Sequence, residues 1–306
     1  MIWPALTAFA KAAVVDTHCL AGIDRRWTTR TLMPEGDTIF RAANTLHRAL
    51  AGRAVTAFES MFPSVTRIAD SHRLVGRDIE SVAARGKHLL MTFSGGLVLH
   101  THMRMNGSWH LYRPGERWKR PRRDMRLIVA TADIVAVGFN VPVAELLTPR
   151  DLARHDDLRA LGPDLLDPAF DRAEALRRIR AHGGDAIADV LLNQRVAAGI
   201  GNVFKSEVLF LGGIDPFTAV TQLTDDDLET LIDIGRKVLA VSVRAGQRTT
   251  RGSLDPGARL WVYGRGGQPC RRCGTPIQSK KTGLDARLTY WCPRCQSRKY
   301  EVGSTK

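Results

Sequence analysis

The 306-residue sequence predicts an α+β protein with a β-rich first half, a helical second half and a small cysteine module near its C-terminal end. Three observations carry this prediction. Short apolar runs fill residues 55–137, the apolar spacing changes to that of helices after Pro149, and two close pairs of cysteines follow residue 269. A chain of this length is expected to form about two domains.

The first expected element is a helix over residues 37–50, because apolar side chains recur there at three- and four-residue spacing. Short apolar runs follow, separated by glycine and other turn residues at the spacing typical of a sandwich or barrel. The expected strands cover residues 55–58, 65–68, 88–93, 97–100, 125–130 and 134–137. We therefore expect an N-terminal β domain with a leading helix over residues 34–148, a sandwich or a barrel, and of these two we favour the β-sandwich.

The second half of the chain shows helical spacing instead. Glycine-containing breaks at residues 183–184 and 199–201 divide it into segments. The expected helices cover residues 173–181, 186–192, 203–209 and 225–243. These patterns predict a helical domain over residues 149–248, followed by the cysteine module over residues 262–300.

The charge balance indicates the class of partner. The formal net charge is +14 and the pI is near 10.2, with arginine the dominant cation. Guanidinium groups bind phosphate oxygens in a bidentate manner, so this balance favours a nucleic acid as the partner. No run of roughly 18 apolar residues occurs, and we therefore expect no membrane-spanning helix.

Four of the five cysteines form two pairs, Cys270-x2-Cys273 and Cys292-x2-Cys295, with 18 residues between the pairs. This spacing predicts one tetrahedral Zn²⁺ site, and four thiolates would leave no open position for catalysis. The zinc ion is therefore expected to be structural, in a protein of a reducing cytosol. Two unrelated cysteine pairs or a disulfide-linked hairpin are the alternatives.

An unusual Met-Pro pair occurs at Met33 and Pro34. A proline at a chain terminus is a free secondary amine and a nucleophile, whereas a proline inside a chain is an amide without a basic nitrogen. An ordinary turn before a helix is the alternative for this segment. Residues 1–32 are expected to be an extra leader, disordered or produced by a wrongly assigned start codon, and we favour the latter. Without them the net charge is still +12.

Three further segments carry candidate chemistry. Residues 199–207 place a glycine-flanked turn and Asn202 ahead of a helix, which suits a phosphate, although a plain capped helix has the same pattern. Residues 85–88 form a basic turn that could be merely solvent-exposed. Residues 102–107 combine Arg104 with two methionines, which fill cores in most proteins but could also enter a base stack as a wedge.

Taken in order, these segments resemble the formamidopyrimidine-DNA glycosylase and endonuclease VIII family of base-excision repair enzymes. The resemblance runs from Met33 to about residue 297. It consists of an amino-terminal motif at residues 33–36, a β-domain lysine turn at 85–87, a helix–two-turn–helix signature at 199–207, and a zinc finger introduced by residues 262–265. Each motif is weak or moderate alone, and their joint occurrence in this order is specific.

The resemblance implies a role for individual residues. Pro34 would be the nucleophile, Glu35 the neighbouring acid/base, and Lys87 a phosphate contact that assists the reaction. DNA would be held by Asn202 beside the lesion, by Arg287 of the finger hairpin, and by Arg104 and Met105 in the gap left by a flipped base. The zinc ligands would be Cys270, Cys273, Cys292 and Cys295.

The function implied is that of a bifunctional DNA glycosylase and AP lyase, acting through an N-terminal proline iminium with β,δ-elimination. Its partner would be damaged duplex DNA and its only cofactor the structural zinc, in a monomeric, cytoplasmic, nucleoid-associated protein. Residues 288–293 and 33–37 resemble the endonuclease VIII branch, which acts on oxidised pyrimidines.

Two alternatives remain open. Residues 102–107 look more like the branch that acts on 8-oxoguanine and ring-opened purines. An interpretation of another class is a non-catalytic, zinc-dependent DNA-binding protein, which follows if the leader is retained and Pro34 is an amide.

Overall fold

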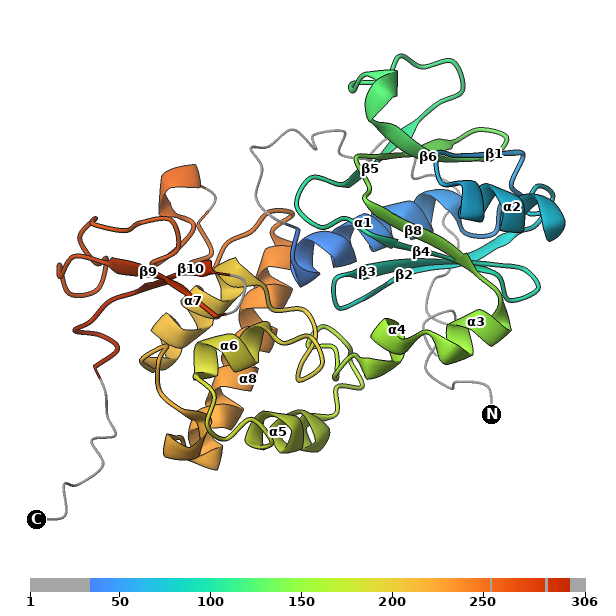
Figure 1. The fold of residues 1–306 in the computed structure, drawn as a ribbon. Coiled ribbons are helices and arrows are strands. Elements are labelled where there is room, and N and C mark those ends of the chain that lie inside the picture. Colours follow the sequence, from blue (N-terminus) through green and yellow to red (C-terminus); the bar gives the residue numbers. More distant parts are fainter. Residues whose placement is uncertain (1–33, 254, 284–285, 298–306) are drawn as a thin grey trace, which may run out of the picture.

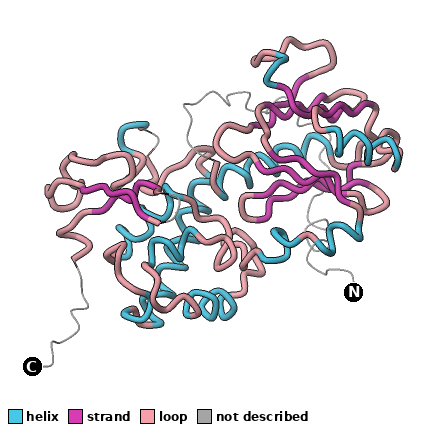
Figure 2. Tube along the Cα trace, viewed as in Figure 1, coloured by secondary structure: helices cyan, strands magenta, loops and turns pink. Residues whose placement is uncertain are grey.

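The computed structural model describes residues 34–253, 255–283 and 286–297. The expected leader at 1–32 and the last residues of the expected cysteine module, 298–300, lie outside the described residues. Figure 1 shows a β-rich half that contains α1 and a helical half that carries a small hairpin, and Figure 2 shows the same division by secondary structure. The expected α+β architecture is confirmed.

The first half is a sandwich of two four-stranded sheets in which the neighbouring strands are antiparallel. One sheet has the order β1-β6-β7-β5 and the other β2-β3-β4-β8. The bounds are β1 Ala57–Ser60, β2 Ile79–Arg85, β3 His88–Phe93, β4 Val98–His102, β5 Ser108–Tyr112, β6 Met125–Ala130, β7 Val135–Phe139 and β8 Val143–Leu147.

Helix α1 (Gly36–Leu50) runs along the sandwich and shares one apolar core with strands of both sheets (Figure 1). Its buried residues include Ile39, Ala43 and Leu46, which recur at the three- and four-residue spacing of one helical face. The opposite face is polar. The start of α1 points towards the helical half, and α1 contacts helix α8 there. Residues at the start of the sandwich domain therefore also contact the other half of the molecule.

The expected strand at residues 65–68 is wrong, because this segment lies in helix α2 (Pro63–Ser71). Pro63 occupies the first turn, where its missing N–H costs nothing. Val65 and Ala69, four residues apart, are buried on one helical face. A short apolar run fits either period, and the preceding proline was the signal for a helix.

The second half has a core formed by four principal helices. They are α5 Arg172–Arg180, α6 Ile187–Leu192, α7 Asn202–Gly212 and α8 Asp225–Arg244, all close to the expected ranges. Short helices α3 (Pro149–Arg154) and α4 (Asp156–Ala160) lead into this half from the sandwich. Among the described residues, no helix is both long enough and apolar enough to span a membrane.

Helix α7 also holds the hairpin of β9 (Gln278–Thr282) and β10 (Arg287–Trp291). Glu207, fully buried on α7, accepts N–H bonds from Trp261 at 2.8 Å, Val262 at 2.8 Å and Tyr263 at 2.9 Å. The Thr250 hydroxyl donates to the same carboxylate. One buried side chain thus fixes the segment that leads into the cysteine module.

Replacing Glu207 with alanine is expected to lower the free energy of unfolding by about 3 kcal/mol, because several backbone N–H groups become buried and unpaired. Urea unfolding followed by tryptophan fluorescence measures this loss. The control is Glu80→Ala on the exposed face of β2, for which no comparable loss is expected. Equal stability of the two variants would contradict this account of Glu207.

Candidate active site and zinc centre

Glu35 joins the two halves of the molecule. Its buried carboxylate accepts N–H bonds from Gly201 at 3.0 Å, Val203 at 2.8 Å and Phe204 at 3.2 Å. These donors belong to the first turn of α7 and the residue before it, where a helix has N–H groups without internal partners. The carboxylate therefore caps a helix whose N-cap residue, Gly201, lies 166 residues further along the chain.

Two glycines permit this close approach. A Cβ atom at Gly201 would lie 2.3 Å from the Glu35 carboxyl carbon, and one at Gly36 would lie 2.8 Å from the Gly199 backbone. The Gly36 N–H also donates to the Gly199 carbonyl at 2.9 Å. The glycine-flanked turn at 199–201 is thus required where the backbone meets Glu35, and Pro34 lies directly before this contact.

A buried ion-pair network supports the same end of α1. Asp37 accepts hydrogen bonds from Arg248 at 2.8 Å and from Arg41 at 3.1 Å. Burial raises the pKa of Asp37, but the two guanidinium groups together outweigh burial and hold the pKa below its ordinary value. The Arg248 guanidinium also lies 3.7 Å from Glu35. The sequence did not single out Arg248, because nothing near residue 248 signals a partner at residue 37.

Lys87 lies in the turn between β2 and β3, and the Gly86 N–H holds this turn by donating to Asp164 at 2.6 Å. Burial lowers the pKa of Lys87 to about 8, the charge of Glu35 opposes that shift, and Arg287 and Arg248 add to it. A Cβ atom at Gly86 would lie 2.8 Å from the Ala198 Cβ, so the Lys87 turn packs against the segment that leads into α7. Glu35 contacts the same segment through Gly201.

Asn202 is the first residue of α7 and is buried. Its Nδ2 donates to the Leu288 carbonyl of β10 at 2.9 Å, so it ties the helix start to the hairpin that carries Arg287. Three residues on, the Lys205 ammonium is fully buried and donates to Thr289 Oγ1 at 2.7 Å. Burial lowers the pKa of Lys205 to about 8. The sequence did not single out Lys205, although it falls within the glycine-flanked segment.

The loop from Met103 to Gly107 gives its two methionines different roles. Met103 is buried in the sandwich core, whereas 57% of the Met105 side chain is exposed. Arg104 has a left-handed backbone (φ 44°), and its N–H donates to His102 Nδ1 at 3.0 Å. A Cβ atom at Gly107 would lie 2.7 Å from the Met103 carbonyl, so this turn requires glycine. Only Met105 is therefore available as a wedge.

The four paired cysteines meet at the other end of α7. Their Sγ atoms all lie within 4.8 Å of one another, with Cys270–Cys295 at 3.9 Å and Cys273–Cys292 at 3.4 Å. A disulfide would require about 2 Å, whereas thiolates about 2.3 Å from one tetrahedral zinc fit the observed separations.

Backbone N–H groups donate to the sulfurs of two of these cysteines, Cys270 and Cys292, as expected for zinc knuckles. Phe210, near the end of α7, packs against the cysteine cluster. Since α7 has 11 residues, it separates this cluster from Glu35 by about 16 Å.

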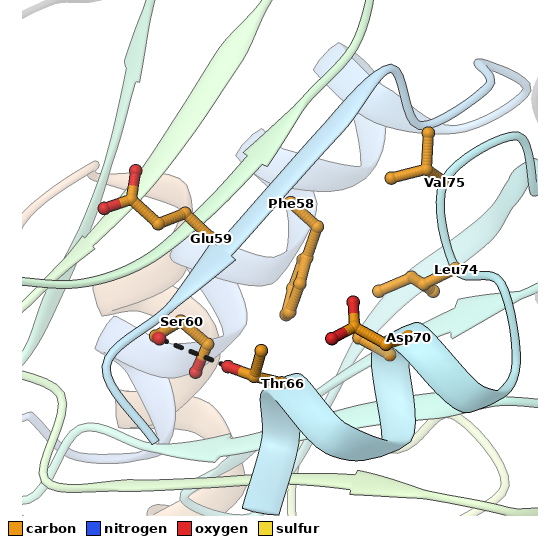
Figure 3. Close-up of a pocket in the computed structure, with 8 residues that line it drawn as sticks. Phe58, Glu59, Ser60, Thr66, Asp70, Leu74 and Val75 are labelled. Atoms are coloured by element: carbon orange, nitrogen blue, oxygen red, sulfur yellow. Dashed lines mark hydrogen bonds between the residues drawn. The ribbon is translucent and has the colours of Figure 1, made fainter. Parts of the chain in front are cut away.

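A cavity of about 180 Å³ lies between β1 and α2, lined by Phe58, Thr66 and Leu74 among others (Figure 3). None of the expected site residues lines it. The candidate site is instead the junction at which α1, the Lys87 turn and the start of α7 meet.

Comparisons with known proteins agree with this arrangement. Three family models match: the formamidopyrimidine-DNA glycosylase N-terminal domain at residues 33–143, the H2TH domain of the same enzymes at 161–253, and the zinc finger found in FPG and IleRS at 267–298. The four cysteines, clustered and matched by the third model, hold one structural Zn²⁺.

The alignments with curated relatives cover almost the whole length of each relative. The probable endonuclease 8 2 of Streptomyces coelicolor is 42% identical, with 87% of this chain and 94% of that protein covered. The DNA-(apurinic or apyrimidinic site) lyase Nei2 of Mycolicibacterium smegmatis is 38% identical, covering 87% and 99%. Endonuclease 8 of Escherichia coli is 34% identical, covering 86% and 100%.

Solved structures of Lactococcus lactis Fpg have the same fold. The complex with abasic-site DNA superposes with a TM-score of 0.74 at 25% identity, covering 87% of this chain and 100% of that chain. The complex with DNA containing an oxidised pyrimidine has a TM-score of 0.74 at 26% identity, with the same coverage.

The buried position of Lys87 predicts a measurable effect on stability. The pKa of Lys87 in the folded protein is lowered to about 8 from 10.5. Between pH 8 and pH 10.5 the unfolded chain therefore binds this proton more tightly than the folded chain does, and below pH 8 the protonated lysine destabilises the fold. Lys87→Met should therefore unfold at a higher urea concentration than the wild type at pH 7. This difference should shrink as the pH rises from 8 to 10.5.

The control is Lys237→Met on the exposed surface of α8, which removes a lysine charge without changing a buried site. A Lys87→Met variant that is less stable than the wild type at pH 7 would mean that the ammonium is well solvated or well paired.

Proposed function

Because this chain belongs to the formamidopyrimidine-DNA glycosylase and endonuclease VIII family, we propose that the junction around Glu35 is the active site of a DNA repair enzyme. The protein is a bifunctional DNA glycosylase and AP lyase that binds damaged DNA. The single observation that carries the site assignment is the docking of Glu35 and Gly36, directly after Pro34, onto the segment that opens α7, against which the Lys87 turn also packs.

In the proposed reaction the Pro34 nitrogen attacks C1′ of the damaged deoxynucleotide. The new N–C1′ bond forms as the base leaves with its bonding electrons and takes up a proton, and opening of the sugar ring yields an iminium. Loss of the C2′ proton then expels the 3′ phosphate, and a second elimination expels the 5′ phosphate. The covalent intermediate divides one difficult step into easier ones.

This chemistry requires Pro34 to be the amino terminus, with Met33 and the preceding residues absent. Two observations support that requirement. The match to the family's N-terminal domain begins at residue 33, and Escherichia coli endonuclease 8 is covered to 100% of its own length by about 86% of this chain. The catalytic domain proposed here spans residues 34–148.

Glu35 is the proposed proton carrier at the sugar ring oxygen, and its bonds to α7 fix the carboxylate relative to Pro34. General acid–base help of this kind contributes about 10²–10⁴-fold. Lys87, Asn202 and Arg287 are the proposed phosphate contacts. Arg104 and Met105 would fill the gap left by the flipped base, whose unstacking costs a few kcal/mol. We propose that the protein acts on duplex DNA as a monomer.

Oxidised pyrimidines are the proposed lesion class, supported by the endonuclease 8 names of the curated relatives. The 8-oxoguanine alternative is favoured by one specific observation, the sequence of residues 102–107, which looks more like that branch. We expect duplexes with thymine glycol to be cleaved at least about tenfold faster than duplexes with 8-oxoguanine. Single-turnover gel assays measure both rates, and the reverse order would assign the protein to the purine branch.

Borohydride trapping tests the enzyme against the non-catalytic alternative. A protein that begins at Pro34 after methionine removal should form a covalent adduct with abasic-site DNA, because reduction fixes the iminium. The full 306-residue chain, with its leader retained, should form none. A Pro34-start protein without an adduct would contradict the proposed nucleophile, and the amino-terminal sequence of the native protein decides which form exists.

A further inference from the structure

A row of side chains crosses the sheet of order β2-β3-β4-β8 and ends at His88, directly after Lys87 of the proposed active site. It joins His155, Glu145, His100 and His88, from the α3–α4 junction, β8, β4 and β3 in turn. Neighbouring rings and carboxylate lie within hydrogen-bond distance: His155–Glu145 at 2.9 Å, His100–Glu145 at 2.8 Å and His88–His100 at 2.8 Å. None of these residues has a role in the proposed reaction.

Backbone donors determine the direction of the row. The Leu158 N–H donates to His155 Nδ1 at 3.3 Å, so a neutral His155 carries its proton on Nε2 and donates it to Glu145. His100 then donates from Nδ1 to the same carboxylate oxygen. Its Nε2 is left as an acceptor for the Nδ1–H of His88.

The last ring of the row faces His102. His88 and His102 are register partners at the ends of β3 and β4, and their rings meet edge to face with centroids 4.8 Å apart. His102 Nδ1 accepts the Arg104 N–H at 3.0 Å, so its own proton lies on Nε2. Lys87 directly precedes His88, and the loop carrying Met105 directly follows His102.

The surroundings favour neutral rings. Burial lowers the pKa of His88 to about 3 and that of His102 to about 4. The cations near these two rings, which add to the shifts, are Arg85 of β2, Lys87 of the turn and Arg104 of the loop. Among the groups described here, the acidic groups that act on the row are Glu145, between His155 and His100, and Asp157, and both oppose the effect of burial on the pKa of His100.

A bound metal ion is a weaker explanation of the same cluster. His100, Glu145 and His155 offer ligand atoms within 4.8 Å of one another. A metal would need lone pairs at His100 Nδ1 and His155 Nε2, the two nitrogens whose protons the carboxylate accepts. The Leu158 N–H at the opposite nitrogen of His155 also disfavours that tautomer.

We propose that this histidine row is a positioning device for the active site, holding the strand ends that carry the Lys87 turn and the Met105 loop. The key positioning residue is His102, which lies just outside the row and meets its last ring, His88, edge to face. Its Nδ1 accepts the Arg104 N–H and so stabilises a left-handed backbone at the base of the wedge. This inference rests on the proposed function, in which Met105 fills the gap in a duplex.

The tautomers give a test that does not depend on activity. Long-range ¹H–¹⁵N NMR spectra at pH 7 should show His88 and His100 as Nδ1–H forms and His155 and His102 as Nε2–H forms. Added Zn²⁺ or EDTA should leave these signals unchanged. Cationic rings, another tautomer pattern, or a zinc-dependent shift of His100 and His155 would overturn the row.

Paired variants test the positioning role. In His102→Leu, cleavage of an abasic site in duplex DNA should fall by roughly tenfold or more, whereas cleavage of the same site in a single strand should change less than about twofold, because no partner strand must be held open. His102→Asn, whose Oδ1 can accept the Arg104 N–H, should regain most of the duplex activity. His72→Asn, on the exposed end of α2, is the control.

Equal losses on both substrates, or no recovery in His102→Asn, would refute the positioning role. The assay uses the Pro34-start protein. If the Pro34-start protein without any substitution cleaves neither substrate, the proposed function fails. The tautomer pattern then still decides whether the histidine row exists.

Discussion

The bond between the Glu35 carboxylate and the first turn of α7 is the interaction on which the rest of the structure depends. It joins the sandwich to the helical half through three N–H donors, at a point where glycines allow the two backbones to touch. A helix start has unpaired N–H groups and a partial positive charge, so a carboxylate is the natural partner. The geometry of the proposed nucleophile follows from this contact.

Helix α7 connects this contact to the zinc hairpin, because its side chains bond to the hairpin and to the segment before it. Asn202 and Lys205 bond to β10, and Glu207 holds the segment leading to the cysteines. The zinc ion therefore stabilises a hairpin in which Leu288, the neighbour of Arg287, accepts a hydrogen bond from Asn202 at the start of α7. Keeping the Lys87 ammonium at this site is costly, because burial, and after it the charges of Arg287 and Arg248, lower its pKa. Proteins retain this kind of cost at sites where function requires it.

Local patterns accounted for much of the fold. Helices α5 to α8 and strands β3 and β6 lie close to their expected ranges, because each repeats one period over enough residues. Strands β2, β5 and β8 were missed. The Ala- and Glu-containing sequences of β2 and β8 favour helix when read alone. Their place in the sheet comes from pairing with β3 and β4, which only the folded chain provides.

The sequence by itself determined the α+β architecture, the zinc ligands and the candidate residues, because spacing within a short segment reflects which side chains share a face or a knuckle. Only the tertiary structure decided which of those residues meet. The Arg248–Asp37 pair spans 211 positions and the Glu35–Val203 bond spans 168. Such contacts depend on how whole elements dock, and no local spacing encodes the docking. The histidine row belongs to the same class, since it draws one side chain from each neighbouring element.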